Sequence, residues 1–410
     1  MFLPCDLREW LPADHLVHFL LDAVEQIPTG HFHINHRGTG SEQYPPTLLL
    51  ALLIYCYATG RFGSRTIEAA THSDVAVRYL CANHHPDHDS IGVFRTANRA
   101  AWKAAFVTVL QLARQLRLTR VGTVSVDGTK VQANASKHAA VSYQRAGELI
   151  GQLQLEVQEL VTRAKELAAA QQVEHQAKVA ARQAQRAAGK KPRGPEPQPP
   201  SETPDPKAQY NFTDPESRIM KAGNGQHFEQ AYNAQAAVNE VMLIVGQRVS
   251  AAPNDKQELV ATVAAISPVV AGDIHAVLVD SGFYSAAAVQ AVEQKPDGTP
   301  RGLTVYAAVA KQTHHQSVAD LLPQPEPAPL ATDASPKEKM VHRLQTSGGK
   351  QLYKLRKQTV EPVFGIIKSV LGFRQFLLRG REKVSLAWLL ICVSYNFKRL
   401  FTLKNLAATG

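Results

Sequence analysis

The stretch Thr123–Lys130 reads Thr-Val-Ser-Val-Asp-Gly-Thr-Lys, an apolar β-branched run that ends in an aspartate followed by glycine. β-Branched residues favour strands, and glycine favours the turn or loop that follows. We therefore expect Asp127 to lie at a strand end, where its carboxylate faces a loop. A second stretch, Ala276–Ser285, repeats the pattern with Asp280 at the strand end and Gly282 in the turn. Two carboxylates at two strand ends predict one metal site assembled from distant segments.

The composition is typical of a chain of two or three domains with a polyanionic partner. The chain has 410 residues, 44% of them hydrophobic, and a formal net charge of +10. This length exceeds one typical domain, and the positive charge favours nucleic acid as a partner. The cysteines form no Cys-x-x-Cys pair, which argues against a structural zinc site or a disulfide scaffold. The N-terminus lacks a signal-peptide pattern, and the apolar stretches Thr47–Tyr57 and Ser385–Val393 are too short to span a bilayer. We therefore expect a cytoplasmic protein without a membrane partner.

The chain divides into three predicted regions. Residues 1–115 show apolar residues at helical spacing, which predicts an all-helical N-terminal domain that either binds DNA ends or only packs on its neighbour. Residues 116–130 and 210–400 contain strands and helices in the order β-β-β-α-β-α-β. That order predicts an α/β domain, a mixed sheet with flanking helices. Residues 131–209 interrupt this domain as an insertion.

The insertion at 131–209 is expected to be helical. Its apolar residues follow heptad spacing over about three repeats, which predicts a helical hairpin or a coiled-coil arm. These residues are Ile150, Leu153, Val157, Leu160, Ala164 and Leu167. The proline-rich stretch Pro192–Pro206 predicts an extended or disordered linker. Three roles stay open for the insertion: a surface excursion without function, a dimer contact, and a clamp on DNA.

A third acidic residue lies late in the chain. If this segment is a helix, one face about 80° wide carries an acid framed by bases and a phenol. The residues of that face are Tyr353, Lys357, Glu361 and Lys368. A solvated face with a Lys357–Glu361 pair would give the same pattern. Pro362 disfavours helical geometry at Glu361, so the helix is expected either to kink there or to begin anew at Pro362.

Together these stretches resemble the DDE transposases of bacterial insertion sequences, in the branch with a Tyr-Arg-Glu-Lys signature. The resemblance is carried by Val126–Lys130, by Val279–Tyr284, and by the set Tyr353, Arg356, Glu361 and Lys368. Supporting stretches are Pro86–Ser90, Thr213–Arg218 and Tyr232–Val238. The likeness spans about residues 1–400 in the family's order.

The resemblance implies that the mixed sheet is RNase H-like and that Asp127, Asp280 and Glu361 form a catalytic, metal-binding triad. It implies two Mg²⁺ ions, which Mn²⁺ can replace, because such hard cations prefer carboxylate oxygens. Asp127 would bridge both ions. The implied reaction is water attack at the transposon end, followed by attack of the freed 3′-OH on target DNA. The implied partners are terminal inverted repeats and target DNA, bound by a homodimer on paired ends at the bacterial nucleoid.

The family's DNA-contacting positions fall on Tyr353, Arg356 and Lys368. Four residues separate Arg356 from Glu361 where the family's signature has three, so Lys357 can share the arginine's role. A basic run around two phenylalanines is predicted to contact phosphates and includes Arg374, Arg379 and Arg381.

No tryptophan follows Asp280 before Trp388, so a DNA-hairpin intermediate is not expected. Should Glu361 not be the third ligand, Glu382 and Glu338 are the next candidates. Three alternatives to transposition stay open: a metal-dependent nuclease of the same fold without strand transfer, a catalytically inactive DNA-binding derivative, and an interaction protein built on the coiled-coil arm.

Overall fold

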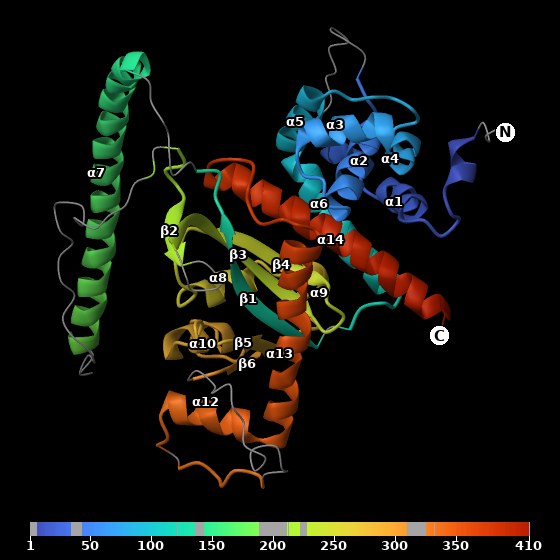
Figure 1. Ribbon diagram of the computed structural model, residues 1–410. Coiled ribbons are helices and arrows are strands. Elements are labelled where there is room, and N and C mark those ends of the chain that lie inside the picture. Colours follow the sequence, from blue (N-terminus) through green and yellow to red (C-terminus); the bar gives the residue numbers. More distant parts are fainter. Residues whose placement is uncertain are drawn as a thin grey trace. The chain divides into compact units, whose positions relative to one another are not determined.

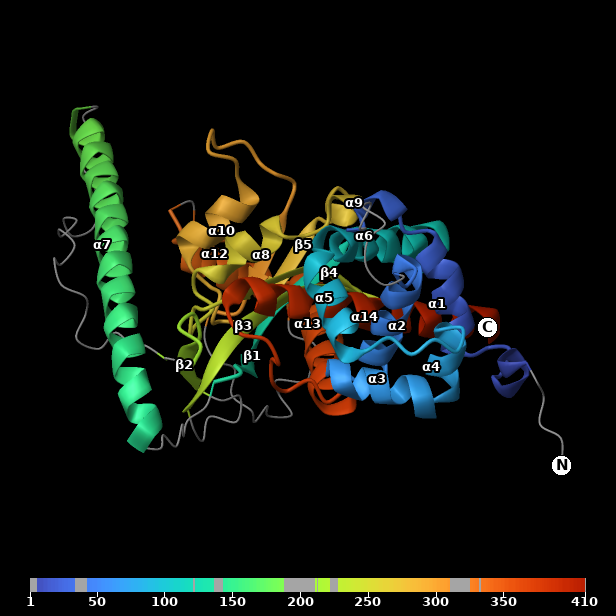
Figure 2. The ribbon, with the colours of Figure 1, turned by 90° about the horizontal axis from the view of Figure 1, so that it is seen from above.

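The computed structural model describes residues 6–33, 43–120, 122–135, 143–187, 211, 213–221, 228–309, 325–331 and 333–409. The chain forms two compact units. The larger unit comprises Met1–Ala135 and Asn211–Gly410, and the smaller one comprises Ser136–Tyr210. The larger unit combines helices with a mixed sheet (Figures 1 and 2), which confirms the predicted α/β class.

The N-terminal part of the larger unit contains helices and no strand among its described residues. Its elements are η1 (Leu7–Trp10), α1 (Leu16–Glu25), η2 (Thr29–His31), α2 (Pro46–Ala58), α3 (Ser64–Ser73), α4 (Val75–Leu80), α5 (His88–Ala97) and α6 (Arg99–Gln115). The side chains of Asp74 and Asp87 accept backbone hydrogen bonds at the starts of α4 and α5 and so cap these helices. α2 is apolar on all sides and buried from Leu49 to Ala58, so it is the central helix of this part.

A six-stranded mixed sheet forms the second part of this unit. The strands are β1 (Thr123–Gln132), β2 (Arg218–Lys221), β3 (Phe228–Asn239), β4 (Ile244–Ser250), β5 (Ala276–Val279) and β6 (Thr304–Ala307). Their order is β2-β3-β1-β5-β6, and β4 also pairs with β3. β1 is antiparallel to β3 and parallel to β5, which is in turn parallel to β6. Strand β2 was not expected, because its four residues carry no apolar alternation.

Helices cover both faces of the sheet. α13 (Ser347–Gly365) contacts β1, β3 and β5, and α8 (Glu258–Ala264) contacts β4, β3 and β1. This part also contains α9 (Pro268–Ala271), α10 (Ala286–Glu293) and α12 (Pro336–Gln345). The buried hydroxyls of Thr359 on α13 and Ser125 on β1 lie 2.7 Å apart, so α13 covers the Ser125 face. Side chains alternate along a strand, so Asp127 shares this face, while Gly128 lies on the other.

The helix that carries Glu361 runs continuously through Pro362 and leads into a π-helical segment, Ile366–Val370. The alternative in which a new helix begins at Pro362 is therefore wrong. Proline lacks the N–H for one helical hydrogen bond. Packing offsets this cost, because Val360 and Val363 on either side are fully buried.

The last helix, α14 (Arg381–Thr409), joins the two parts of the larger unit (Figure 1). It packs against α2 and α6 and against β4. The Asn396 amide bonds to both backbone groups of Ile244. Length and composition alone would allow α14 to cross a membrane, but 78% of its apolar window is buried inside the protein, as in a core helix. The boundary predicted near residue 115 thus separates the N-terminal helices from the sheet along the sequence. In the folded chain, however, α14 packs against both parts.

The smaller unit contains α7 (Tyr143–Ala187), a continuous helix of 45 residues. The predicted helical hairpin is therefore wrong for these residues, whereas the coiled-coil arm stays a prediction. Apolar side chains of α7 are solvent-exposed, including Val157 at 50% and Val161 at 49%. The predicted linker Pro192–Pro206 lies outside the described residues.

Candidate active site

Strands β1 and β5 bring Asp127 and Asp280 to neighbouring positions. Ser125 is paired in parallel with Leu278, and continuing this register by two residues places the two aspartates opposite each other. The Oδ1 atoms of Asp127 and Asp280 each accept a 2.8 Å hydrogen bond from a backbone N–H, of Gly128 and Gly282 respectively. These bonds orient both carboxylates and leave the Oδ2 atoms to face other groups.

Arg356 on α13 contacts all three predicted acids. Its Nη2 lies 2.9 Å from Asp127 Oδ2 and 3.9 Å from Asp280 Oδ2. Its Nη1 lies 2.9 Å from Glu361 Oε1. The arginine side chain is only 11% exposed, whereas that of Glu361 is 48% exposed. Three carboxylates from β1, from the end of β5 and from α13 thus converge on one guanidinium group.

Burial dominates the electrostatics of this cluster. It raises the pKa of Asp127 to about 7 against the attraction of Arg356, and the nearby negative charge of Asp280 raises it further. Burial alone would lower the pKa of Arg356, but the surrounding acids, led by Asp127, raise it above its ordinary value. Asp127 is therefore a carboxylate whose charge depends on the cation beside it.

The other residues of the predicted signature have different surroundings. Tyr353 is half-buried, and its hydroxyl donates a 3.0 Å hydrogen bond to the Val279 carbonyl, beside Asp280. Lys368 is also half-buried, and its ammonium group donates a 2.6 Å bond to the Lys130 carbonyl. Lys357 is exposed on α13. Tyr353 and Lys368 thus hold α13 and the π-helical segment against the strands, while Lys357 is free to meet a ligand.

The predicted basic run is attached to the strand that carries Asp127. The Gln132 N–H donates to the Arg374 carbonyl at 3.1 Å, and the Phe376 N–H donates to the Gln132 carbonyl at 2.8 Å. This segment thus covers the edge of β1 beyond the end of β5. The arginines of the run are exposed, namely Arg374, Arg379 and Arg381, whereas Phe373 and Phe376 are buried. The two phenylalanines therefore belong to the core and cannot stack on bases.

A largely buried polar cluster, not predicted from the sequence, lies on the opposite face of β1. Asp255 Oδ1 accepts 2.7 Å hydrogen bonds from the amides of Asn233 and Gln235 and lies 3.6 Å from Lys130 Nζ. Gly128 faces this cluster, and a Cβ there would overlap the Gln235 amide and lie 2.7 Å from Asp255 Oδ1. The glycine is thus required for close approach. The amides of Asn233 and Gln235, two residues apart within the alanine-rich stretch Ala231–Ala237, are the signal that could have revealed the cluster.

The acid cluster fits a divalent metal in its chemistry. All three donors are carboxylates, which Mg²⁺ and Mn²⁺ prefer, and all three already contact one positive group. In the described part of the chain, no three or more His, Cys, Asp or Glu side chains are grouped closely enough to hold a metal ion. The guanidinium of Arg356 lies between the carboxylates and accounts for this spacing.

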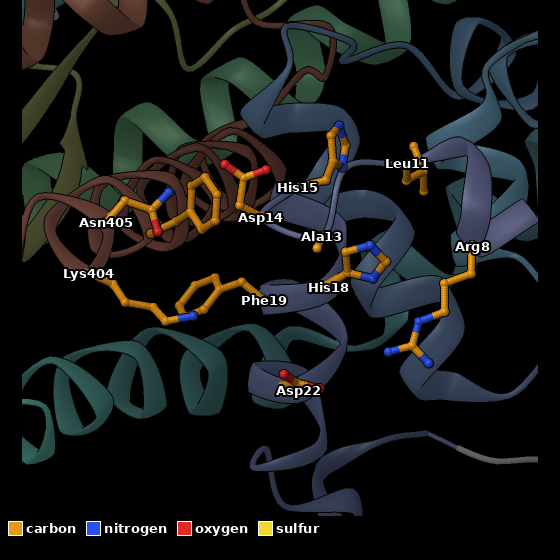
Figure 3. Close-up of a pocket in the computed structure, with 11 residues that line it drawn as sticks. Arg8, Leu11, Ala13, Asp14, His15, His18, Phe19, Asp22, Lys404 and Asn405 are labelled. Carbon is orange, nitrogen blue, oxygen red and sulfur yellow. The ribbon is translucent and has the colours of Figure 1, made fainter. Parts of the chain in front are cut away.

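A separate pocket of about 590 Å³ lies among η1, α1 and the end of α14 (Figure 3). It contains none of the predicted site residues. Acidic Asp14 and Asp22 line it together with basic Arg8 and Lys404, and the Lys404 ammonium lies 5.6 Å from the centre of the Phe19 ring. Because its charges largely balance, this pocket lacks the excess positive charge that a phosphate site needs.

The pKa of Asp127 predicts a pH-dependent difference in stability. Its folded-state pKa of about 7 exceeds that of an unfolded aspartate, about 4. The stability that arises from this difference is present below about pH 4 and is lost as the pH rises to about 7. Asparagine does not titrate, so Asp127→Asn avoids this loss. In EDTA, we therefore expect the free energy of unfolding of Asp127→Asn, minus that of the wild type, to be larger at about pH 8 than at about pH 5. Urea denaturation at both pH values measures this gain, and a difference that does not change with pH would contradict it.

Two family models match the chain. A transposase DDE domain matches residues 329–401, and a transposase domain (DUF772) matches residues 5–97. The first range includes Arg356, Glu361 and the basic run, while Asp127 and Asp280 lie outside both ranges. No curated protein and no solved structure matches the chain. The two matches support a transposase family, and with it a nucleic-acid-processing enzyme.

Proposed function

We propose that this chain is a DNA transposase that cleaves at the ends of its insertion sequence and joins the 3′-OH to target DNA. The observation that carries the proposal is the convergence of Asp127, Asp280 and Glu361 on one cationic centre. The sheet order supports an RNase H-like domain, because β1, β3 and β4 are successively antiparallel while β5 and β6 run parallel to β1. The net charge of +10 suits a DNA substrate.

The proposed cofactors are two Mg²⁺ ions, which Mn²⁺ can replace, held by the three carboxylates. When bound, they would stabilise the attacking and leaving oxygens of the phosphodiester. The protein itself fixes the donors: backbone N–H groups orient the two aspartates, and the packing of α13 on β1 places Glu361. Tyr353 is a positioning residue, because its hydroxyl is engaged by the Val279 carbonyl.

The exposed bases around the acid cluster are the proposed DNA contacts. Lys357 lies one residue after Arg356 on α13, and the basic run lies along the end of β1. Together they would bind phosphates on either side of the cleavage point. The helical N-terminal part is proposed to bind the transposon ends, and a homodimer would hold two ends together at the nucleoid.

The test is a strand-transfer assay with the full-length wild-type chain. The substrate is DNA that carries the element's ends, with a supercoiled plasmid as target and Mg²⁺ or Mn²⁺ present. We expect cleavage at the ends and covalently joined products, both lost in EDTA. Cleavage without joining would instead identify a nuclease. End binding with neither reaction would identify an inactive derivative.

The DNA contact proposed for Lys357 gives a measurable effect on binding. Replacing Lys357 with glutamine is expected to weaken DNA affinity and to reduce the slope of log affinity against log salt by about 1. Lys295→Gln, in an exposed loop after α10, is the matched control and should leave the slope unchanged. Fluorescence anisotropy over a salt series measures both variants. Equal slopes for Lys357→Gln and the wild type would argue against a phosphate contact there.

A further inference from the structure

We propose that Arg356 is an internal counter-cation of the acid triad, which occupies the centre of the three carboxylates until divalent metal displaces it. The inference rests on the proposed function, because it concerns how the same site takes up metal. It assigns Arg356 a role different from the DNA contact predicted from sequence.

The contacts of Arg356 carry this inference. Its Nη2 is shared between Asp127 and Asp280, and its Nη1 bonds to Glu361. The side chain is 11% exposed, so both terminal nitrogens face acids of the protein and not solvent. A phosphate of bound DNA would have to compete with three carboxylates for this group. Lys357, the next residue, is exposed, so a phosphate could bind it without competing with these carboxylates.

The acid cluster needs a compensating positive charge even when no metal is bound. Three carboxylates close together repel one another, and burial strengthens that repulsion. Arg356 supplies the compensating charge from within the chain, so the acids can stay close before metal arrives. Its Nε is buried and has no hydrogen-bond partner among the described residues, so this position of the side chain leaves one donor unsatisfied. Moving out of the cluster would relieve that penalty.

Competition follows from the shared position. A ligand that binds only after Arg356 has left loses affinity by the factor with which the arginine favours its occupied position. Arg356 therefore stabilises the metal-free protein and weakens metal binding together. Removing the guanidinium should therefore destabilise the metal-free protein and strengthen metal binding.

The first experiment follows Arg356 in the wild-type chain. Phenylglyoxal modifies accessible arginines, and peptide mass spectrometry reports the modified fraction of each. We expect Arg356 to be protected in EDTA. With saturating Mn²⁺ it should react at least about fivefold faster, which corresponds to a shift of about 1 kcal/mol toward the displaced position of its side chain. Exposed Arg374 is the internal control and should react equally in both conditions. Equal or stronger protection of Arg356 with Mn²⁺ would overturn the proposal.

The second experiment compares Arg356→Gln with Lys295→Gln, which removes an exposed positive charge outside the site. We expect Arg356→Gln to bind Mn²⁺ about tenfold more tightly by calorimetry, to melt at a lower temperature in EDTA, and to gain more in melting temperature from Mn²⁺ than the wild type. Lys295→Gln should match the wild type in all three. Unchanged or weaker Mn²⁺ binding by a folded Arg356→Gln protein would overturn the proposal. If the wild type binds no Mn²⁺ at all, the proposed metal chemistry itself fails, which is a distinct result.

Discussion

Replacing Asp127 with asparagine is expected to abolish DNA strand cleavage, with a loss of at least about a thousandfold in rate. Asparagine keeps the shape of the side chain but removes the charge that the proposed metal ligand would need. The fold should survive, because the surroundings of this buried position already favour the uncharged form of Asp127. DNA binding should also survive, since the exposed bases are untouched. Gel assays of end cleavage and anisotropy of end binding measure the two quantities separately.

The same loss is expected for Asp280→Asn and Glu361→Gln, whose carboxylates contact the same guanidinium group. Two other glutamates serve as controls. Glu382 pairs with Arg99 at 2.7 Å, and Glu338 caps the start of α12. Glu382→Gln and Glu338→Gln should therefore cleave normally. Normal cleavage by Glu361→Gln, with a loss in either control variant, would place the third ligand elsewhere.

Replacing Trp388 with alanine is expected to lower the free energy of unfolding by about 3–5 kcal/mol, the usual cost of removing a buried aromatic side chain. Trp388 is fully buried on α14, and its indole N–H donates a 3.1 Å hydrogen bond to the Gln235 carbonyl on β3. Its ring packs against Phe364, three residues after Glu361. The indole thus connects the last helix to the sheet and to α13, and it is not available to hold a flipped base.

Urea denaturation of Trp388→Ala measures this loss. Trp10→Ala is the matched control, because Trp10 is 41% exposed. The control should cost about 1 kcal/mol or less. A Trp388→Ala protein with wild-type stability but defective DNA processing would show that the indole acts on DNA and not in the core.

Both strands that carry the aspartates were predictable because β-propensity is a local signal, but only one of the two predicted strand ends is correct. A β-branched run followed by aspartate and glycine correctly marks the end of β5, since Asp280 directly follows its last residue, Val279. The same pattern was wrong for Asp127, because β1 continues through Asp127 and Gly128 to Gln132 and stays paired with β3 over this length. The course of α13 was harder to predict. Pro362 argues locally for a break, but the burial of Val360 and Val363 outweighs one missing helical hydrogen bond. Tertiary packing thus overrode a local preference.

The extent of α14 was underestimated for a related reason. The sequence shows only the short apolar stretch Ser385–Val393, but the helix spans Arg381–Thr409 and is buried on several sides. Its neighbours α2, α6 and β4 come from distant parts of the chain. Periodicity within one segment cannot reveal how many partners that segment will have.

By itself, the sequence determined which residue types are available, that both aspartates follow β-branched runs in strands, and that β5 ends before Asp280, because β-propensity and turn chemistry act over a few residues. It also determined the excess of positive charge. Only the tertiary structure decided that Arg356 lies between the three acids, and that Gly128 faces a buried amide cluster. Both depend on the register of β1 with β5 and β3 and on the packing of α13, which join residues more than 100 positions apart. Such contacts leave no local pattern, since each is made by elements that are brought together only when the core forms.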